Sequence, residues 1–412
     1  MRLRRLLAAL AALTVGVTLA GCGAGDDGRG TVTVWTYPVI ADPEADREFW
    51  DRTAAAFRDA HPDLDVTVVS QPWENRDASL SAALLAGKGP DVAYLISDQV
   101  GRYYAQDVLA PIEDYLSEET LSGYRDNALA SMSVDGRPYA APMIMSAFVG
   151  SCDKRILDET GITPPKTWQD VLDIGPKLKD AGYYTTYYQG DLKSTLNMNF
   201  YQFVWQAGGS VFSADGKSLA VDGEEGVAAL TFLKELVDSR FVDRSALTQA
   251  YQPDQSPMAR GEVACVYNLA PNDVEKAMGG REHIEVTPPL TGAVQAAFGA
   301  VGGYAVFRDA RDPEAARAWM THLSSPDVIA DYNKTAGYFS PHEAVADLYA
   351  DDPVFGAAEQ YLDVTVPGEP HPRAREVQEL IGPQVQAALL GVKTPEAALA
   401  DAAAQADPLL RD

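Results

Sequence analysis

The fold is decided by residues 31–96, which carry three short runs of β-branched and apolar residues: TVTVW at 31–35, DVTVV at 65–69 and DVAYLI at 91–96. Such runs are typical of buried strands. Apolar residues at helical spacing predict a helix over Pro43–Ala60 and another near Leu80–Ala86. The order strand, helix, strand, helix, strand predicts a parallel α/β sheet.

Ligands of parallel α/β sheets bind beyond the carboxyl ends of the strands. Here those ends are Trp35–Tyr37, Ser70–Trp73 and Ser97–Gln99, and all three are predicted to be loops. They supply aromatic rings, a carboxylate and an amide. The first part of a binding site is therefore expected at this edge of the sheet.

The rest of the chain predicts a second α/β unit and a helical end. Residues 143–286 have their own turn and helix signals, with a hairpin turn at Asp215-Gly216 and an amphipathic helix over Gly226–Asp238. No internal repeat of 20–50 residues is visible. A strand is predicted at 300–307, and helices at 312–323, 327–334, 374–390 and 395–406.

Composition excludes several classes of protein. The chain has 412 residues, of which 46% are hydrophobic and 22% charged, and these fractions argue against a disordered chain or a multi-span membrane protein. Its 59 acidic residues exceed its 33 basic ones and give a formal charge of -26. An excess this large repels the phosphate backbone, so no nucleic-acid partner is expected.

The first residues predict export. Arg2, Arg4 and Arg5 precede an uncharged apolar run over residues 6–21, which is too short to span a bilayer as a helix. Residues 1–21 are therefore predicted to be a signal peptide. The run ends in Leu19-Ala-Gly-Cys22, which resembles the lipobox of bacterial lipoproteins.

That resemblance implies that Cys22 is lipidated and anchors the exported chain to the outer face of the cytoplasmic membrane. Residues 22–30 would then be the lipidated cysteine and a flexible Gly/Asp-rich tether. The alternative is a free thiol near an ordinary cleavage site. The other two cysteines, Cys152 and Cys265, can form a disulfide in an exported protein or remain buried free thiols.

Six segments together resemble the extracellular solute-binding proteins of ABC importers, in the carbohydrate-binding family that includes maltose-binding protein. The resemblance covers the whole mature chain and rests on the order and spacing of the segments together with the lipobox. The segments are Thr33–Trp35, Gly89–Val92, Asp135–Tyr139, Thr163–Trp168, Ala259–Ala264 and Arg308–Ser325.

The resemblance implies an α/β, two-lobe, periplasmic-binding-protein-like fold, in which each lobe is a sheet flanked by helices. Lobe 1 is expected over residues 31–142 plus 300–340, and lobe 2 over 143–299 plus 341–412. A hinge with crossings near Pro142, Gly299 and Pro341 would let the lobes close on a sugar. A membrane permease of the transporter would then recognise the closed, monomeric protein.

A sugar site needs aromatic platforms together with carboxylates and amides that pair with hydroxyls. Asp98 is the strongest polar candidate, with a solvated loop residue as the alternative, and Ser146 matches a position that is a carboxylate in several relatives. Tyr267 follows a strand where the family places a stacking tryptophan. Asparagines before Ala207 suit hydroxyl pairing or helix capping. The predicted ligand-binding residues are Tyr37, Trp73, Asp98, Gln99, Ser146, Asp191, Asn197, Asn199, Tyr267, Asn268, Gly303, Tyr304 and Tyr338.

Enzyme chemistry finds little support. The five histidines form no metal-binding motif, and no nucleophile-elbow or phosphate-loop pattern occurs, so no catalytic residue, metal or cofactor is predicted. A secreted glycoside hydrolase stays as an alternative because its two carboxylates need no local motif. A binding protein for a non-sugar solute is the other alternative, and a charged cleft would be its mark.

Overall fold

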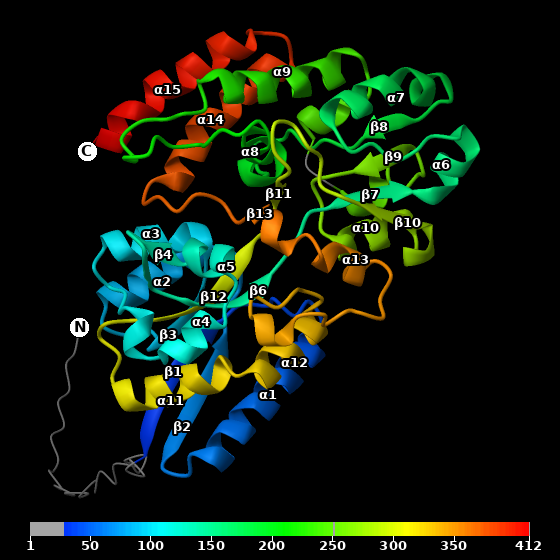
Figure 1. The fold of residues 1–412 in the computed structure, drawn as a ribbon. Coiled ribbons are helices and arrows are strands. Elements are labelled where there is room, and N and C mark those ends of the chain that lie inside the picture. Colours follow the sequence, from blue (N-terminus) through cyan, green and yellow to red (C-terminus); the bar gives the residue numbers. More distant parts are fainter. Residues whose placement is uncertain (1–28, 250–251, 412) are drawn as a thin grey trace, which may run out of the picture.

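The computed structural model describes residues 29–249 and 252–411. They form two lobes, each built on its own β-sheet with helices packed around it (Figure 1). The two-lobe α/β architecture expected from the sequence is confirmed. The signal peptide, Cys22 and most of the tether lie outside the described residues.

The first sheet has five strands. Strands β2, β1 and β3 are parallel, as predicted, whereas β12 runs antiparallel to both β3 and β6. Its spatial order is β2 (Leu64–Ser70), β1 (Gly30–Thr36), β3 (Val92–Ile96), β12 (Val301–Val306) and β6 (Ala141–Met145).

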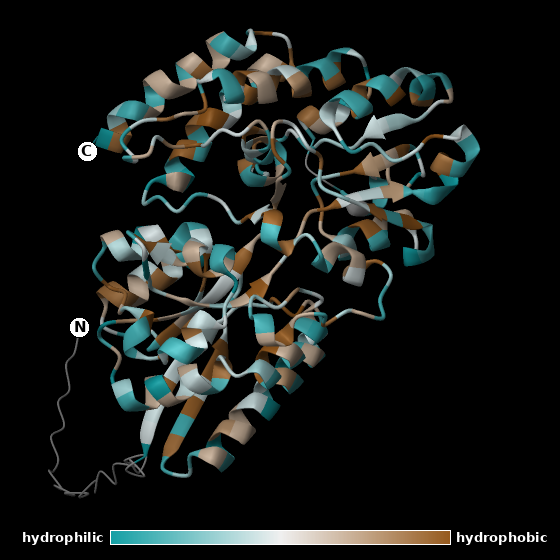
Figure 2. Cartoon of the chain, in the orientation of Figure 1, coloured by the Kyte–Doolittle hydropathy of each residue, from teal (hydrophilic) through white to brown (hydrophobic). Residues whose placement is uncertain are grey.

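Aspartate side chains cap two helices of this lobe. The side chain of Asp42 accepts hydrogen bonds from two backbone N–H groups of the first turn of α1 (Pro43–Ala60), and Asp312 does the same for α11 (Pro313–Leu323). α1 packs its aromatic side chains against α11 and α12 (Pro326–Ala336), with the Phe57 and Trp319 ring centroids 5.1 Å apart. Polar and apolar residues alternate along α1, α11 and α15 (Pro395–Arg411), as expected for amphipathic helices (Figure 2).

The second sheet has the order β10 (Ile284–Thr287), β7 (Gly150–Asp153), β9 (Val263–Val266) and β8 (Tyr184–Thr186). Cys152 and Cys265 face each other in the antiparallel pair β7 and β9 and form a disulfide, which answers the question that the sequence left open. α7 (Trp168–Asp180) packs on β8 of this sheet, whereas α14 (Ala374–Leu389) and α15 pack on α9 (Glu224–Asp238) and on each other (Figure 1).

Apart from several 3-10 turns, the remaining elements are short or lie at the lobe boundaries. They are α2 (Arg76–Leu85), α3 (Ser97–Ala105), α4 (Glu118–Ser122), α5 (Asp126–Ser131), β4 (Ser133–Val134), β5 (Arg137–Pro138), α6 (Lys154–Thr160), a π-helical turn (Asn197–Tyr201), α8 (Gln202–Gln206), α10 (Pro271–Met278), β11 (Ala297–Phe298), α13 (Phe355–Glu359) and β13 (Thr365–Val366).

The chain passes between the lobes near two of the expected positions. β6 ends at Met145 and β7 begins at Gly150, and β11 ends at Phe298 shortly before β12 begins. The chain after Pro341 still contacts lobe 1, because the Tyr349 hydroxyl donates to the carbonyl of Asn333. β13 then pairs with β11, further along the chain than the expected third crossing.

The predicted loop over Ser97–Gln99 is wrong, because these residues are the first turn of α3. The side chain of Gln99 accepts a hydrogen bond from the backbone N–H of Ile96 and so satisfies a donor at the start of this helix. Within residues 29–249 and 252–411, no helix is both long and apolar enough to cross a bilayer. The same residues contain no cluster of three His, Cys, Asp or Glu side chains suited to a metal ion.

Candidate functional site

A cleft of about 700 Å³ lies between the lobes. One wall comes from the starts of α2 and α3 in lobe 1, and the facing wall is residues 188–199 of lobe 2. Phe148 and Phe298 lie at the base, near the two chain crossings, and α14 closes one side. The side chains of the two walls and of α14 are mostly carboxylates, amides, hydroxyls and cations.

The lobe 1 wall is tied to lobe 2 by a network of charges. Asp98, in the first turn of α3, accepts two hydrogen bonds from Arg375 of α14, at 2.9 Å from Nε and 3.3 Å from Nη2. A third guanidinium nitrogen, Nη1, lies 2.5 Å from Asp77 of α2. Burial lowers the pKa of Arg375, but the two carboxylates outweigh it and raise the pKa overall. Arg375 therefore stays charged and holds α14 against lobe 1.

The lobe 2 wall is a polar loop that is organised around Asp191. This buried carboxylate accepts hydrogen bonds from the hydroxyl of Ser194 at 2.6 Å and from the amide of Gln189 at 3.2 Å. Gln378 of α14 accepts from the backbone N–H of Leu196 at 3.2 Å and from the hydroxyl of Thr195. These bonds fix the loop before it meets a ligand, which lowers the entropy lost on binding.

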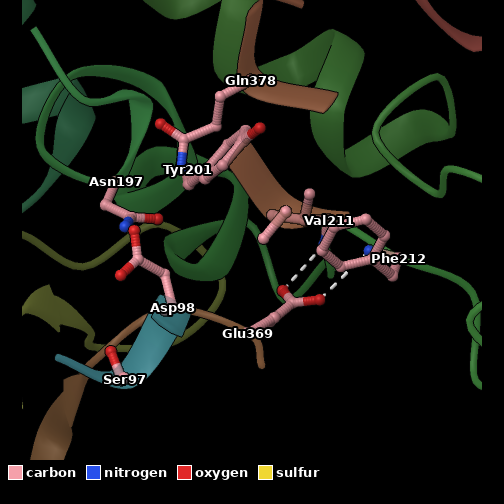
Figure 3. A pocket seen from close by; sticks show the side chains of 10 residues that line it. Ser97, Asp98, Asn197, Tyr201, Val211, Phe212, Glu369 and Gln378 are labelled. Atoms are coloured by element: carbon pink, nitrogen blue, oxygen red, sulfur yellow. Dashed lines mark hydrogen bonds between the residues drawn. The ribbon is translucent and has the colours of Figure 1, made fainter. Parts of the chain in front are cut away.

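A narrow pocket continues the cleft past Asp98 (Figure 3). There Asp98 of α3 and Asn197 of the π-helical turn point toward each other. The Asn197 side chain makes no hydrogen bond with any residue that the structure describes, so its amide is free to pair with a ligand. Tyr201 lines the same pocket, and its buried hydroxyl has no hydrogen-bond partner among the described residues.

Glu369 forms the far side of this pocket. Its carboxylate accepts hydrogen bonds from the backbone N–H groups of Val211 at 2.7 Å and Phe212 at 3.0 Å (Figure 3). It also accepts one from the indole of Trp205 at 2.9 Å. Phe212 and Glu369 also line a second cavity of about 740 Å³ between the lobes. The narrow pocket thus lies between the two larger cavities.

Four predicted site residues line the cleft: Asp98, Asp191, Asn197 and Asn199. Asn268 is buried behind this wall, and its amide lies 3.4 Å from the side-chain oxygen of Asn199. It therefore supports a lining residue and does not itself reach the surface of the cleft.

The predicted aromatic platforms lie elsewhere. Tyr37 and Tyr304 are 1% exposed in the lobe 1 core, and the Tyr304 hydroxyl lies 2.9 Å from that of Thr36. Tyr267 is buried in the lobe 2 core, beside a small apolar cavity. Burial raises the pKa of Tyr37 to about 12 and also raises that of Tyr267. Tyrosine rings that complete a hydrophobic core cannot act as platforms for a ligand in this conformation.

Two more aromatic residues are accessible but do not line the cleft. The Trp73 ring is 39% exposed and stacks on Tyr37 at 5.0 Å, so intramolecular contacts hold it. Tyr338 is half-buried in lobe 1, and its carbonyl accepts a hydrogen bond from the Tyr349 hydroxyl. Neither ring is placed by the structure on a wall of the cleft.

Three small or polar predicted residues have structural partners instead. Gln99 is buried and bonds Ile96 and Asp77. The Ser146 hydroxyl accepts from the backbone N–H of Ala300 at 2.9 Å, which links two chain crossings. At Gly303 a Cβ would lie 2.0 Å from the carbonyl of Ala141, so this glycine is required by strand packing.

Several cleft residues escaped the sequence analysis. They come mainly from α14, whose position beside α3 depends on contacts between residues far apart in the chain. The amphipathic pattern of α14 predicts a helix, but nothing in it tells which polar residues face lobe 1. The missed lining residues include Arg76, Gln189, Lys193, Arg375, Gln378, Glu379 and Gln386.

The comparisons with known proteins agree on one family of binding proteins. The sequence profile described as "Bacterial extracellular solute-binding protein" matches residues 41–330. A putative binding protein of Brucella abortus is 22% identical over 95% of this chain and 96% of its own length. The galactooligosaccharide-binding protein of Bacillus subtilis is 25% identical, with coverage of 94% and 93%.

A solved structure has the same fold. The cyclic alpha-maltosyl-1,6-maltose binding protein from Arthrobacter globiformis superposes with a TM-score of 0.80 at 19% identity, covering 93% of this chain and 100% of that one.

Proposed function

This chain belongs to the bacterial extracellular solute-binding proteins, and we propose that it captures a carbohydrate between its lobes for an ABC transporter. The observation that carries the proposal is the lining of the cleft. Amide and carboxylate side chains from both lobes, with Asn197 and Asp98 opposed, supply the paired donors and acceptors that sugar hydroxyls require. The binding of oligosaccharides by named relatives supports the same ligand class.

The ligand is a short oligosaccharide. The 700 Å³ cleft continues through the narrow pocket of Figure 3, which shares Phe212 and Glu369 with the second cavity. The 700 Å³ cleft would hold the chain of sugar units, because the narrow pocket, with a volume of about 10 Å³, is too small for a sugar ring in this conformation. Contacts with both lobes would then favour the closed state that the permease recognises.

The protein works as a lipoprotein on the outer face of the cytoplasmic membrane. The lipobox ending at Cys22 supports this location, as does the family, whose description is extracellular. Residues 22–30 would connect the folded domain to the lipid on Cys22. The protein acts as a monomer.

A hydrolase is disfavoured by the state of the two candidate carboxylates. A glycosidase needs one carboxyl group that can deliver a proton. Asp98 is held by Arg375, and Asp191 accepts hydrogen bonds from Gln189 and Ser194. Hydrogen-bond donors of the protein therefore occupy both carboxylates, and we expect the sugar to be bound without being cleaved.

The proposal is tested by a thermal-shift screen of the full-length chain against monosaccharides, oligosaccharides, amino acids and peptides. A ligand at about 100 times its Kd adds roughly 2.7 kcal/mol to stability. We expect a shift with one related set of oligosaccharides, which are recovered uncleaved. The non-sugar solute stays as the second candidate, because the cleft is lined by charged side chains that include Arg76, Lys193 and Arg375. A shift with amino acids or peptides alone would replace the carbohydrate by such a solute. Recovery of a cleaved sugar would restore the hydrolase.

A further inference from the structure

Arg76 differs in its contacts from Arg375, the other arginine that lines the cleft. It is the first residue of α2, it is half-buried, and its guanidinium carbon lies 5.0 Å from the centroid of the Trp73 ring. Its side chain makes no ion pair or hydrogen bond with any residue in the described part of the chain. In a protein with 59 acidic and 33 basic residues, a guanidinium in a cleft without a carboxylate partner needs an explanation.

The nearby carboxylates are already engaged. Asp98 is bonded by Arg375, whereas Asp77 is shared between Arg375, Gln99 and, at 3.9 Å, Arg102. This cluster therefore contains three guanidinium groups, those of Arg76, Arg102 and Arg375, but two carboxylates. Burial and the charge of Arg375 lower the pKa of Arg76, and together they outweigh the opposite effect of Asp98 and Asp77.

The opposite wall adds a second cation. Lys193 is exposed on the lobe 2 loop and makes no ion pair with a described residue. Its neighbour Asp191 is bonded by Ser194, by Gln189 and by the backbone N–H of Lys193 itself. The remaining carboxylate of the lining, Glu379, lies on α14 and is exposed.

We propose that the ligand is an acidic saccharide whose carboxylate binds Arg76, an inference that rests on the proposed function. A guanidinium offers two parallel N–H donors to a carboxylate, a match that lysine lacks. The contact with the Trp73 ring holds the guanidinium in place without using its N–H donors, which are left for the ligand. Lys193 attracts the same anion from lobe 2, so the charge contributes to closure.

The experiment compares an acid with its own ester on the wild-type, full-length chain. Calorimetric titrations use di- and trigalacturonate, di- and trimannuronate and cellobiouronate, each beside its methyl ester and the neutral sugar of the same linkage. We expect at least one acid to bind about 10- to 100-fold more tightly than its ester, the range for hydrogen bonds to charged groups. Salt should weaken binding of the acid and leave the ester unchanged.

Variants locate the contact. Arg76→Gln should lose the 10- to 100-fold preference for the acid, and Arg76→Lys should keep part of it. Arg102→Gln is the matched control, because Arg102 lies near the same Asp77 but does not line the cleft. A preference that survives in Arg76→Gln would overturn the assignment of Arg76.

The other outcomes separate the two proposals. Binding of a neutral oligosaccharide without preference for any acid would overturn the acidic ligand and leave the proposed function intact. Binding of no saccharide in either form would overturn both. If Arg76→Gln fails to fold, the comparison of acid and ester on the wild type decides alone.

Discussion

Replacing Arg375 with glutamine should weaken the contact between the lobes by a predictable amount. Arg375 makes two ion pairs with lobe 1, at 2.9 Å to Asp98 and 2.5 Å to Asp77. Its side chain is 37% exposed, and those of Asp98 and Asp77 are 19% and 18% exposed. Hydrogen bonds to charged groups contribute about 1.5–3 kcal/mol when buried, whereas exposed ion pairs contribute about 0.2–1 kcal/mol. After allowance for solvent screening, we expect a loss of about 2 kcal/mol in the free energy of unfolding.

The assay is a double-mutant cycle followed by urea unfolding. Arg375→Gln, Asp98→Asn and the double variant should give a coupling free energy of about 1 kcal/mol. Arg373→Gln is the matched control, because Arg373 lies two residues earlier and, among residues 29–249 and 252–411, forms its ion pair with the exposed Glu376 alone. That control should stay within about 0.5 kcal/mol of the wild type. Zero coupling between Arg375 and Asp98 would refute the interlobe tie.

Three further predictions concern the disulfide, a buried histidine and the lipid anchor. Replacing both Cys152 and Cys265 with alanine removes a disulfide that joins residues 113 positions apart. The free energy of unfolding, measured in urea, should fall by about 2–5 kcal/mol. Unchanged stability would mean that the bond does not form. Burial lowers the pKa of His342, whose Nδ1 accepts a hydrogen bond from the N–H of Ala344. The imidazole therefore binds a proton more strongly in the unfolded chain than in the folded one, and stability falls as the pH drops below about 6.5. In His342→Asn the loss of stability between pH 7 and 5 should be smaller than in the wild type, and an equal loss would exclude His342 as its source. Cys22→Ala should release the protein from the membrane fraction and abolish incorporation of labelled palmitate, and labelled variant protein in that fraction would contradict the lipobox.

The first lobe could be predicted from the sequence because its signals are local. Apolar runs, caps and spacing lie within a few residues of one another, and the helix predicted over Pro43–Ala60 has those bounds in the structure. Asp98 was found for the same reason, since it directly follows β3. Its partner Arg375 was not, because 277 residues separate the two in the chain.

The aromatic residues show a different limit. A tyrosine next to a strand can pack in the hydrophobic core or line the cleft. The local sequence pattern is the same in both cases, so it does not tell which of the two occurs. In this fold Tyr304 closes the lobe 1 core through its contact with Thr36, and Tyr267 packs inside lobe 2. The predicted positions of Asp191 and Asn197 agree better with the structure, because both residues line the cleft. A segment rich in polar residues lies at the surface of a lobe rather than in its hydrophobic core.

The most direct test of a carbohydrate site in the cleft is a calorimetric titration of the full-length chain and of Asn197→Ala. The titrant is the oligosaccharide that gives the largest thermal shift. Asn197 suits the test because its amide makes no hydrogen bond with the described residues, so its removal should not unfold the protein. We predict one site per chain and an affinity about 3- to 10-fold lower in the variant, as for the loss of a neutral hydrogen bond. An oligosaccharide that binds both proteins equally, or a chain that binds none, would contradict the site.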